Sequence, residues 1–370
     1  MSGRSQKTRV LIVDDSVVMR RLLSEAVASD PDLEVAGYAA NGQIALALMD
    51  QVAPDIMTLD VEMPVMNGLV TLEAMRAAGR RLPVIMVSTL TERGAEATID
   101  SLALGASDYI AKPSGLGNYS AARDHLSQSL LPKIKALCRR PIPKQPAELS
   151  PVLSCPASER RRLVPIEVLA VGSSTGGPNA LAQVLPAIPG DFSAPVLIVQ
   201  HMPATFTRFL AQRLNSLCQL TVEEAEDGSL LQPGHMWVAP GGRHLIVSRD
   251  EGQVRLRVTG DPPENSCRPS VDVLFRSVAE VFGSRVLALV LTGMGQDGLR
   301  GCERLAGAGA EIVVQDEATS VVWGMPGFVA RGGLADAVLP LPEIAEYIVR
   351  REAARRSLTS RSMRWAAGAR

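Results

Sequence analysis

Two separate series of short apolar runs, each run followed by a stretch with helical spacing, constrain the fold of this chain most strongly. The runs of the first series are 10–13, 35–39, 56–59, 84–87 and 109–111, with helical patterns such as 17–28 and 68–78. The second series extends from Ile166 to about Ala337, with runs at 168–171, 196–199, 236–239, 286–291 and 312–314. Strands that alternate with helices predict parallel sheets covered by helices. We therefore expect an α/β chain with two doubly wound parallel-sheet domains.

The chain has 370 residues, which agrees with two domains, because domains usually contain about 100 to 200 residues. Between Pro132 and Pro165 the alternation stops, and five further prolines lie among charged residues, a composition typical of a linker. We predict a first domain at 8–131, a linker at 132–164 and a second domain at 165–350. We interpret the arginine-rich tail at 351–370 as a frayed helix end rather than a binding patch.

Charge and cysteine content exclude several classes of partner and location. The 38 basic and 39 acidic residues give a net charge of -1, so nothing favours nucleic acid or an anionic membrane. The polar residues 1–9 precede an apolar run that is too short for a signal peptide, and no segment approaches the ~20 apolar residues of a membrane span. The five cysteines contain no Cys-x-x-Cys pair. We expect a cytoplasmic chain with free thiols that is not inserted in a membrane.

In the first series, polar side chains follow the apolar runs. Asp14 and Asp15 follow the first run, Asp60 the third, Ser88 the fourth and Lys112 the fifth. The carboxyl ends of strands in a doubly wound sheet form the crevice where ligands bind. Clustered carboxylates there either have raised pKa values or hold a hard cation such as Mg²⁺, and a lysine can stabilise a phosphoryl group. The alternative is a solvated strand end with a helix cap.

In the second series, Ser174 lies in a glycine-rich turn, GSSTGG at 172–177, between a strand and a predicted helix. A serine there lies near backbone N–H groups and the positive end of a helix, which suits oxyanion chemistry. Such a turn can instead bind phosphate, although the spacing does not match the dinucleotide fingerprint. Nor does it match the Gly-x-Ser-x-Gly elbow of α/β-hydrolases.

Two further residues complete a possible catalytic triad. His201 follows the run at 196–199, and Asp297 lies in a glycine-rich loop after the run at 286–291. An aspartate there can hold the tautomer of an imidazole that acts as a general base. Taken singly, His201 could be structural and Asp297 a turn residue. Together with Ser174 they predict a serine hydrolase.

The first series resembles the flavodoxin-like receiver domain of bacterial two-component response regulators over about 8–135. The matching motifs are LIVDDS at 11–16, DVEMPVMNG at 60–68, the segment at Ser88 and AKP at 111–113. The resemblance implies that Asp60 accepts a phosphoryl group and that Mg²⁺ is held by Asp14, Asp15, Asp60 and the backbone carbonyl of Glu62. It further implies that Lys112 pairs with the phosphoryl group, that Ser88 moves toward it, and that Tyr109 reports this movement.

The second series resembles the Rossmann-like catalytic domain of the chemotaxis response-regulator protein-glutamate methylesterases over about 166–349. The motifs are GSSTGG at 172–177, QHMPxxFT at 200–207, VAPGGxHL at 238–245, RPSVDVLF at 268–275, LTGMGxDG at 291–298 and DEATSxxWGMP at 316–326. The resemblance implies that Ser174 is the nucleophile, His201 the general base and Asp297 its orienting acid. The backbone N–H of Met294 is a candidate oxyanion donor, and Arg268 a candidate for steering an acidic receptor surface.

These resemblances imply a hydrolase that removes methyl esters from glutamates of chemoreceptors, releases methanol, and deamidates certain receptor glutamines. A histidine kinase of the chemotaxis pathway is the expected phosphodonor, and an unphosphorylated receiver is expected to exclude the receptor from the esterase site. No cofactor is expected for the esterase. Two rivals remain: a hydrolase of the same chemistry that serves a different sensory array, and a catalytically silent, phosphorylation-dependent binding module.

Overall fold

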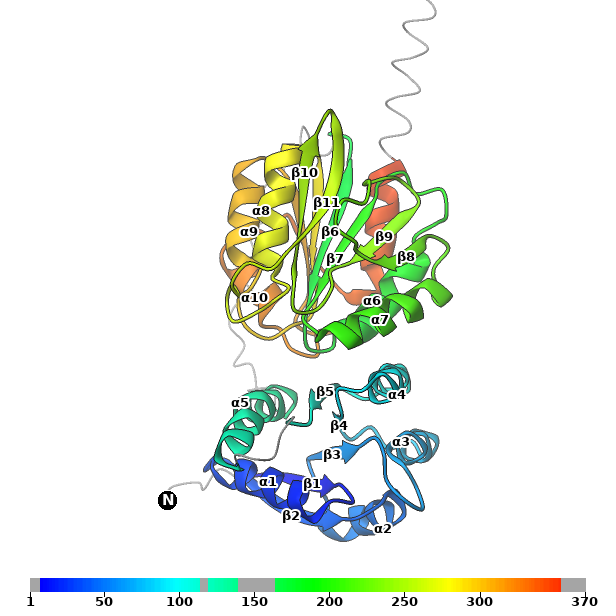
Figure 1. Cartoon of the computed structure of the whole chain (residues 1–370), viewed down its shortest axis with the longest axis vertical. Coiled ribbons are helices and arrows are strands. Elements are labelled where there is room, and N and C mark those ends of the chain that lie inside the picture. Colours follow the sequence, from blue (N-terminus) through cyan, green and yellow to red (C-terminus); the bar gives the residue numbers. More distant parts are fainter. Residues whose placement is uncertain (1–6, 114–118, 139–163, 354–370) are drawn as a thin grey trace, which may run out of the picture. The chain divides into compact units, whose positions relative to one another are not determined.

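The computed structural model describes residues 7–113, 119–138 and 164–353. The chain divides into two compact units, Met1–Ile142 and Pro143–Arg370 (Figure 1). Both units are built on parallel sheets, which confirms the predicted fold class. None of the helices in the described ranges is long and apolar enough to cross a membrane.

The first unit has a five-stranded parallel sheet in the order β2-β1-β3-β4-β5. The helices α1 and α5 bury apolar side chains on one face of this sheet, against alternate residues of β1 such as Val10 and Ile12. Since the strand order reverses between β1 and β3, their carboxyl ends form a crevice. The elements are β1 (Thr8–Val13), α1 (Val17–Ala28), β2 (Leu33–Ala39), α2 (Gly42–Val52), β3 (Ile56–Asp60), α3 (Gly68–Ala77), β4 (Val84–Ser88), α4 (Glu92–Ala103), β5 (Asp108–Ala111) and α5 (Tyr119–Leu137).

Helix α5 corrects the predicted start of the linker. The helix continues through Pro132 and ends at Leu137, so the linker does not begin at residue 132. A proline inside a helix removes one backbone hydrogen bond, but here the helix is held by packing on both sides of it. Leu130 and Ile134 are both fully buried in the core of the first unit. Most of the predicted linker, 139–163, lies outside the described residues.

The second unit has a seven-stranded parallel sheet in the order β14-β13-β12-β6-β7-β9-β8, and an antiparallel hairpin of β10 and β11. Chain order reverses between β6 and β12, so the crevice of this sheet lies at their carboxyl ends. Figure 1 shows α8 and α9 beside one another, and together with the hairpin they cover alternate residues of β6 and β12.

The elements of the second unit are β6 (Val168–Ser173), α6 (Gly177–Val184), η2 (Leu185–Ala187), β7 (Val196–Gln200), α7 (Ala204–Leu217), β8 (Thr221–Glu224), β9 (His235–Val238), β10 (His244–Asp250), β11 (Gln253–Thr259), α8 (Val271–Phe282), η3 (Gly283–Arg285), β12 (Val286–Val290), α9 (Leu299–Gly307), β13 (Glu311–Gln315), α10 (Met325–Arg331) and β14 (Ala337–Leu339). Apolar runs did not predict β8, β10, β11 or β14, because these strands are short or only partly buried.

A last helix at 341–353 corrects the predicted boundary of the tail at residue 351. The Arg351 side chain is buried and donates to Glu311 on β13. A buried arginine requires such a charged partner, and Glu311 supplies it. The rest of the predicted tail, 354–370, lies outside the described residues.

The packing of α5 beyond Pro132 can be tested with Ile134→Ala. Because Ile134 is fully buried, we expect the substitution to lower the free energy of unfolding of the first unit by about 2–5 kcal/mol. Amide hydrogen exchange of peptides from β1 and α1 would report this change for the first unit alone. Gln128→Ala, on the exposed side of the same helix, is the control. Equal exchange in both variants would mean that α5 does not pack beyond Pro132.

Candidate functional site

Strand register brings the loops after β6, β7 and β12 to one edge of the sheet. Ser173 pairs with Gln200 in the parallel ladder, so Ser174 and His201 follow paired residues. The backbone N–H of His201 donates to the Ser173 carbonyl at 3.2 Å. The backbone N–H of Ser174 donates to the Thr292 carbonyl, after β12, at 3.1 Å. The loop that carries Asp297 therefore meets the loops that carry Ser174 and His201.

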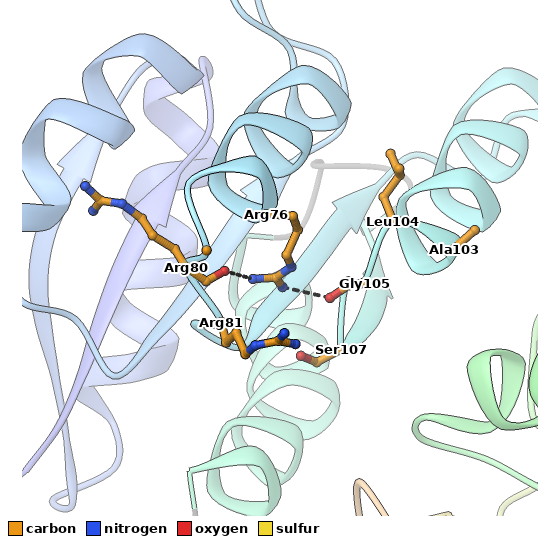
Figure 2. Close-up of a pocket in the computed structure, with 8 residues that line it drawn as sticks. Arg76, Arg80, Arg81, Ala103, Leu104, Gly105 and Ser107 are labelled. Carbon is orange, nitrogen blue, oxygen red and sulfur yellow. Dashed lines mark hydrogen bonds between the residues drawn. The ribbon is translucent and has the colours of Figure 1, made fainter. Parts of the chain in front are cut away.

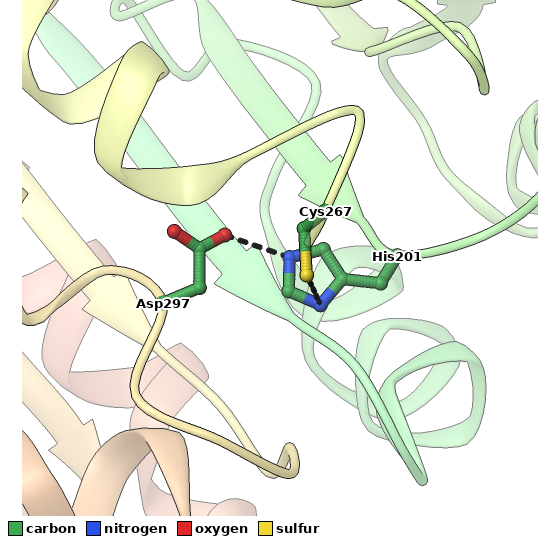
Figure 3. Close-up of side chains that lie close together, drawn as sticks. All are labelled: His201, Cys267 and Asp297. Carbon is green, nitrogen blue, oxygen red and sulfur yellow. Dashed lines mark hydrogen bonds and ion pairs between the residues drawn. The ribbon is translucent and has the colours of Figure 1, made fainter. Parts of the chain in front are cut away.

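His201 and Asp297 are in direct contact. Nε2 of His201 lies 2.8 Å from Oδ2 of Asp297. Figure 3 draws this contact as a dashed line. This contact leaves Nδ1 as the ring nitrogen available for proton transfer. Burial disfavours the imidazolium, but the hydrogen bonds to Asp297 and Cys267 outweigh it and raise the pKa of His201 to about 9.

The Asp297 carboxylate also binds the first turn of α8. Oδ2 accepts the backbone N–H of Val271 at 2.7 Å, and Oδ1 accepts that of Asp272 at 3.1 Å. The Ser270 hydroxyl and the Asn265 amide donate to Oδ1 at 2.8 and 3.0 Å. Burial opposes ionisation, but these donors and His201 hold the pKa of Asp297 below its usual range. Asp297 is therefore a buried carboxylate that stays ionised.

Two residues that the sequence analysis did not single out hold Ser174 and Asp297 in place. The buried Gln200 amide donates to the Ser174 carbonyl at 2.9 Å and accepts the Ser173 hydroxyl at 2.7 Å. His244 accepts the Ser270 backbone N–H on Nδ1, at 3.2 Å, which orients the Ser270 hydroxyl toward Asp297. His244 is therefore a structural histidine beside the site.

The backbone beside Ser174 approaches too closely for larger residues. A Cβ on Gly293 would lie 2.9 Å from the Ser174 Cβ, and a Cβ on Gly177 only 1.9 Å from the Gln200 amide oxygen. The next residue after Gly293 is Met294. Its backbone N–H donates to no residue within the described ranges, so it can donate a hydrogen bond to an oxyanion.

Two further residues lie in the loop before α8. Cys267 places Sγ 3.7 Å from Nδ1 of His201, a contact that the sequence analysis missed because the two residues are far apart in the chain. Arg268 is exposed and donates to the carbonyls of Gly260 and Asp261. Its guanidinium is thus anchored to the start of the same loop, and its role toward a receptor stays a prediction.

In the first unit, Asp14, Asp60 and Lys112 meet at the carboxyl ends of β1, β3 and β5. Nζ of Lys112 lies 2.7 Å from Oδ2 of Asp60 and 3.1 Å from Oδ2 of Asp14. Burial, followed by the charge of Asp14, raises the pKa of Asp60 to about 6. Burial also raises the pKa of Asp14, although Lys112 partly offsets the effect.

These carboxylates fit a hard divalent cation. Carboxylate oxygens of Asp14, Asp15 and Asp60 lie within 4.8 Å of one another. Oδ2 of Asp14 is buried and forms an ion pair with Nζ of Lys112, but it accepts no well-formed hydrogen bond. Such a buried oxygen in an all-oxygen cluster is what a Mg²⁺ ion would satisfy. The Glu62 side chain points elsewhere, to Arg93 at 3.3 Å, so only its backbone remains a candidate ligand.

Ser88 ends β4, and Tyr109 lies on the neighbouring strand β5. The Ser88 hydroxyl donates to the Gly94 carbonyl on α4 at 2.9 Å. The Tyr109 ring is buried, with Nζ of Lys133 5.6 Å from its centroid. A movement of Ser88 toward Asp60 would first break its bond to Gly94.

A separate pocket of about 440 Å³ lies at the opposite end of β4 and β5 (Figure 2). Arg76, Arg80 and Arg81 line it, but the Arg76 guanidinium is bonded to the carbonyls of Arg80, Leu82 and Gly105. Burial and the nearby Arg81 charge lower the pKa of Arg76. Arg80 pairs with Asp50. None of the residues of either candidate site lines this pocket, so it belongs to neither.

Comparisons with known proteins match both units. The family described as "CheB methylesterase" matches residues 169–348, and the "Response regulator receiver domain" family matches residues 10–122. A protein-glutamate methylesterase/protein-glutamine glutaminase of Trichodesmium erythraeum is 49% identical over 93% of this chain and 99% of that protein. One of Nocardioides sp. is 48% identical over 94% of this chain and 96% of that protein. The crystal structure of the Thermotoga maritima CheB methylesterase catalytic domain covers 50% of this chain and 99% of that chain, at 41% identity and a TM-score of 0.49.

The contact between His201 and Asp297 predicts how the imidazole titrates. We expect its pKa, measured by NMR, to lie above the usual value of 6.5, near 9, in the wild type. In Asp297→Asn the charge is removed while burial remains, so the pKa of His201 should fall well below its wild-type value of about 9. Asp227→Asn, on an exposed loop of the same unit, is the control and should leave the pKa unchanged. An unchanged value in Asp297→Asn would contradict the assigned contact.

Proposed function

The chain belongs to the protein-glutamate methylesterase/protein-glutamine glutaminase family, and we propose on this basis that it hydrolyses glutamate methyl esters and deamidates glutamines of chemoreceptors. The receiver unit makes the activity dependent on phosphorylation and gives the chain a role in sensory adaptation. The observation that best supports the esterase is the contact of His201 with the buried Asp297 carboxylate, at the sheet edge where Ser174 also follows its strand.

The reaction begins with proton transfer from Ser174. Nδ1 of His201 takes the hydroxyl proton as Oγ attacks the carbonyl carbon of the ester, and the C–O bond to methanol breaks after His201 returns the proton to the leaving oxygen. A water molecule, deprotonated by His201, then cleaves the glutamyl-serine ester and regenerates Oγ. With a glutamine substrate the leaving group is ammonia.

Asp297 supports this reaction without accepting a proton. Its pKa lies below the usual range, so it remains an anion while His201 becomes an imidazolium. The bond to Nε2 holds the ring orientation in which Nδ1, the nitrogen that Cys267 contacts, acts as the base. The backbone N–H of Met294 would stabilise the oxyanion, a contribution that is typically worth about 10²- to 10³-fold in rate.

In the first unit Asp60 would accept a phosphoryl group from a histidine kinase. A carboxylate oxygen of Asp60 attacks phosphorus as the bond to the donor histidine breaks, and Lys112 pairs with the transferred group. Asp14, Asp15, Asp60 and the Glu62 carbonyl would hold Mg²⁺, which supplies positive charge against the phosphoryl oxygens. Ser88 would then move toward the phosphoryl group, and the Tyr109 side chain would change position in response.

The proposed domain limits follow from the fold. We propose that the receiver extends through α5 to Leu137 and that the catalytic domain includes the helix described at 341–353. The receptor segments that carry the methylated glutamates and the kinase both act in the cytoplasm, so we place the reaction there.

Ser174→Ala tests the nucleophile. We expect methanol release from methylated receptor fragments to fall by about 10⁴-fold or more, since loss of a triad member removes the covalent route. Ser216→Ala, an exposed serine of α7, is the matched control and should retain activity. If Ser174→Ala retained the biological function in full, the silent binding module would be the better account.

Asp60→Asn tests the switch. A small phosphodonor with Mg²⁺ should raise methanol release by the wild type about 5- to 150-fold, the usual range of allosteric coupling, and should have no effect on Asp60→Asn. Asp50→Asn, an exposed carboxylate of α2, is the control and should keep the response. Equal responses in the wild type and Asp60→Asn would overturn the assignment of Asp60.

A further inference from the structure

The ring nitrogen of His201 that faces away from Asp297 has a cysteine beside it. Sγ of Cys267 lies 3.7 Å from Nδ1, while Asp297 holds Nε2, as Figure 3 shows. His201, Cys267 and Asp297 can each offer a ligand atom within 4.8 Å of the others. Cys267 is a free, half-buried thiol.

The separation of sulfur and nitrogen fits one tetrahedral metal ion. Zinc binds thiolate sulfur at about 2.3 Å and imidazole nitrogen at about 2.0–2.1 Å, which for a tetrahedral angle puts the two atoms about 3.6 Å apart. The observed 3.7 Å therefore needs almost no movement of either residue. An ion between these atoms would replace the proton that they now share.

The surroundings of His201 resemble the support that proteins give to metal-binding histidines. Such a histidine usually donates its second ring N–H to a carboxylate, which fixes the tautomer and directs the free lone pair at the metal. Asp297 does this here, and the first turn of α8 fixes Asp297 in turn. The imidazole is thus already oriented for a ligand on Nδ1.

The loop that carries Cys267 is also anchored. Glu264 and Cys267 exchange two backbone hydrogen bonds, at 3.1 and 2.8 Å. Glu264 forms a bidentate pair with Arg276 of α8, at 2.6 Å for each oxygen. Asn265 and Ser266, between them, have left-handed backbones, with φ of 52° and 61°. This tight turn keeps Sγ of Cys267 next to Nδ1 of His201.

We propose that Cys267 Sγ and His201 Nδ1 form a binding site for Zn²⁺, completed by water, and that the bound ion inhibits the hydrolase. The ion binds as the Cys267 thiol loses its proton to solvent. Inhibition rests on the proposed function, because the ion occupies the nitrogen that takes the Ser174 proton. With two protein ligands rather than the four of a structural zinc site, binding is reversible and weaker. The sulfur and nitrogen donors distinguish this site from the all-oxygen cluster of the receiver.

Cobalt binding tests the site without reference to activity. Co²⁺ added to the full, reduced chain in excess Mg²⁺ should give a thiolate-to-metal charge-transfer band in the near ultraviolet, and Zn²⁺ should remove it. Mg²⁺ occupies the receiver carboxylates, which contain no sulfur. Cys267→Ser and Cys267→Ala should both lose the band, whereas the matched control Cys218→Ser should keep it. A wild type with no band, or a band that survives in both Cys267 variants, overturns the proposal.

Inhibition is measured separately by methanol release at controlled free Zn²⁺, each variant being compared with its own metal-free rate. The concentration for half-inhibition should rise at least about 10-fold in Cys267→Ala, and a chelator should restore wild-type activity. Equal inhibition of wild type and Cys267→Ala would overturn the inhibitory role. An enzyme with no methanol release but a Cys267-dependent cobalt band would support the metal site and overturn the proposed hydrolase instead.

Discussion

The Asp297 carboxylate is the group on which the second unit's site depends. It accepts five hydrogen bonds, from His201, Asn265, Ser270, Val271 and Asp272. A buried charge is tolerated only when it is paired or fully hydrogen-bonded, and here the start of α8 supplies two backbone donors. The Ser270 side chain at the N-cap of α8 makes no capping hydrogen bond, because its hydroxyl donates to Asp297 instead. One carboxylate thus caps a helix and orients a histidine.

The parallel sheet supplies the precision that this chemistry needs. Loops after β6, β7 and β12 start from strands whose register is set by continuous ladders, so their first residues cannot drift apart. Hydrogen bonds outside the ladder also hold these loops together. The Gln200 amide donates to the carbonyls of Ser174 and His201, and the Thr292 hydroxyl donates to the Thr175 carbonyl. Rigid strand ends can hold reacting groups closer to a productive geometry than long loops.

The two units use the same architecture for different electrostatics. In the receiver, burial and then the charge of Asp14 raise the pKa of Asp60, and the clustered carboxylates need a cation, which Lys112 supplies in part. In the catalytic unit the charge of Asp297 is balanced by an imidazole and by N–H donors, so no metal is required for it to ionise. The donor atoms therefore select different ions: oxygen in one unit favours Mg²⁺, whereas sulfur and nitrogen in the other favour Zn²⁺.

The sequence by itself determined the two parallel-sheet units and the side chains at their strand ends, because buried strands appear as short uninterrupted apolar runs and ligand-binding residues follow them. Asp14, Asp60 and Lys112 indeed meet, and so do His201 and Asp297. Only the tertiary structure decided which ring nitrogen of His201 faces Asp297, that Cys267 lies against the other, and that α5 continues past Pro132. These features depend on contacts between residues far apart in the chain, and local patterns of apolar and polar residues carry no information about such contacts.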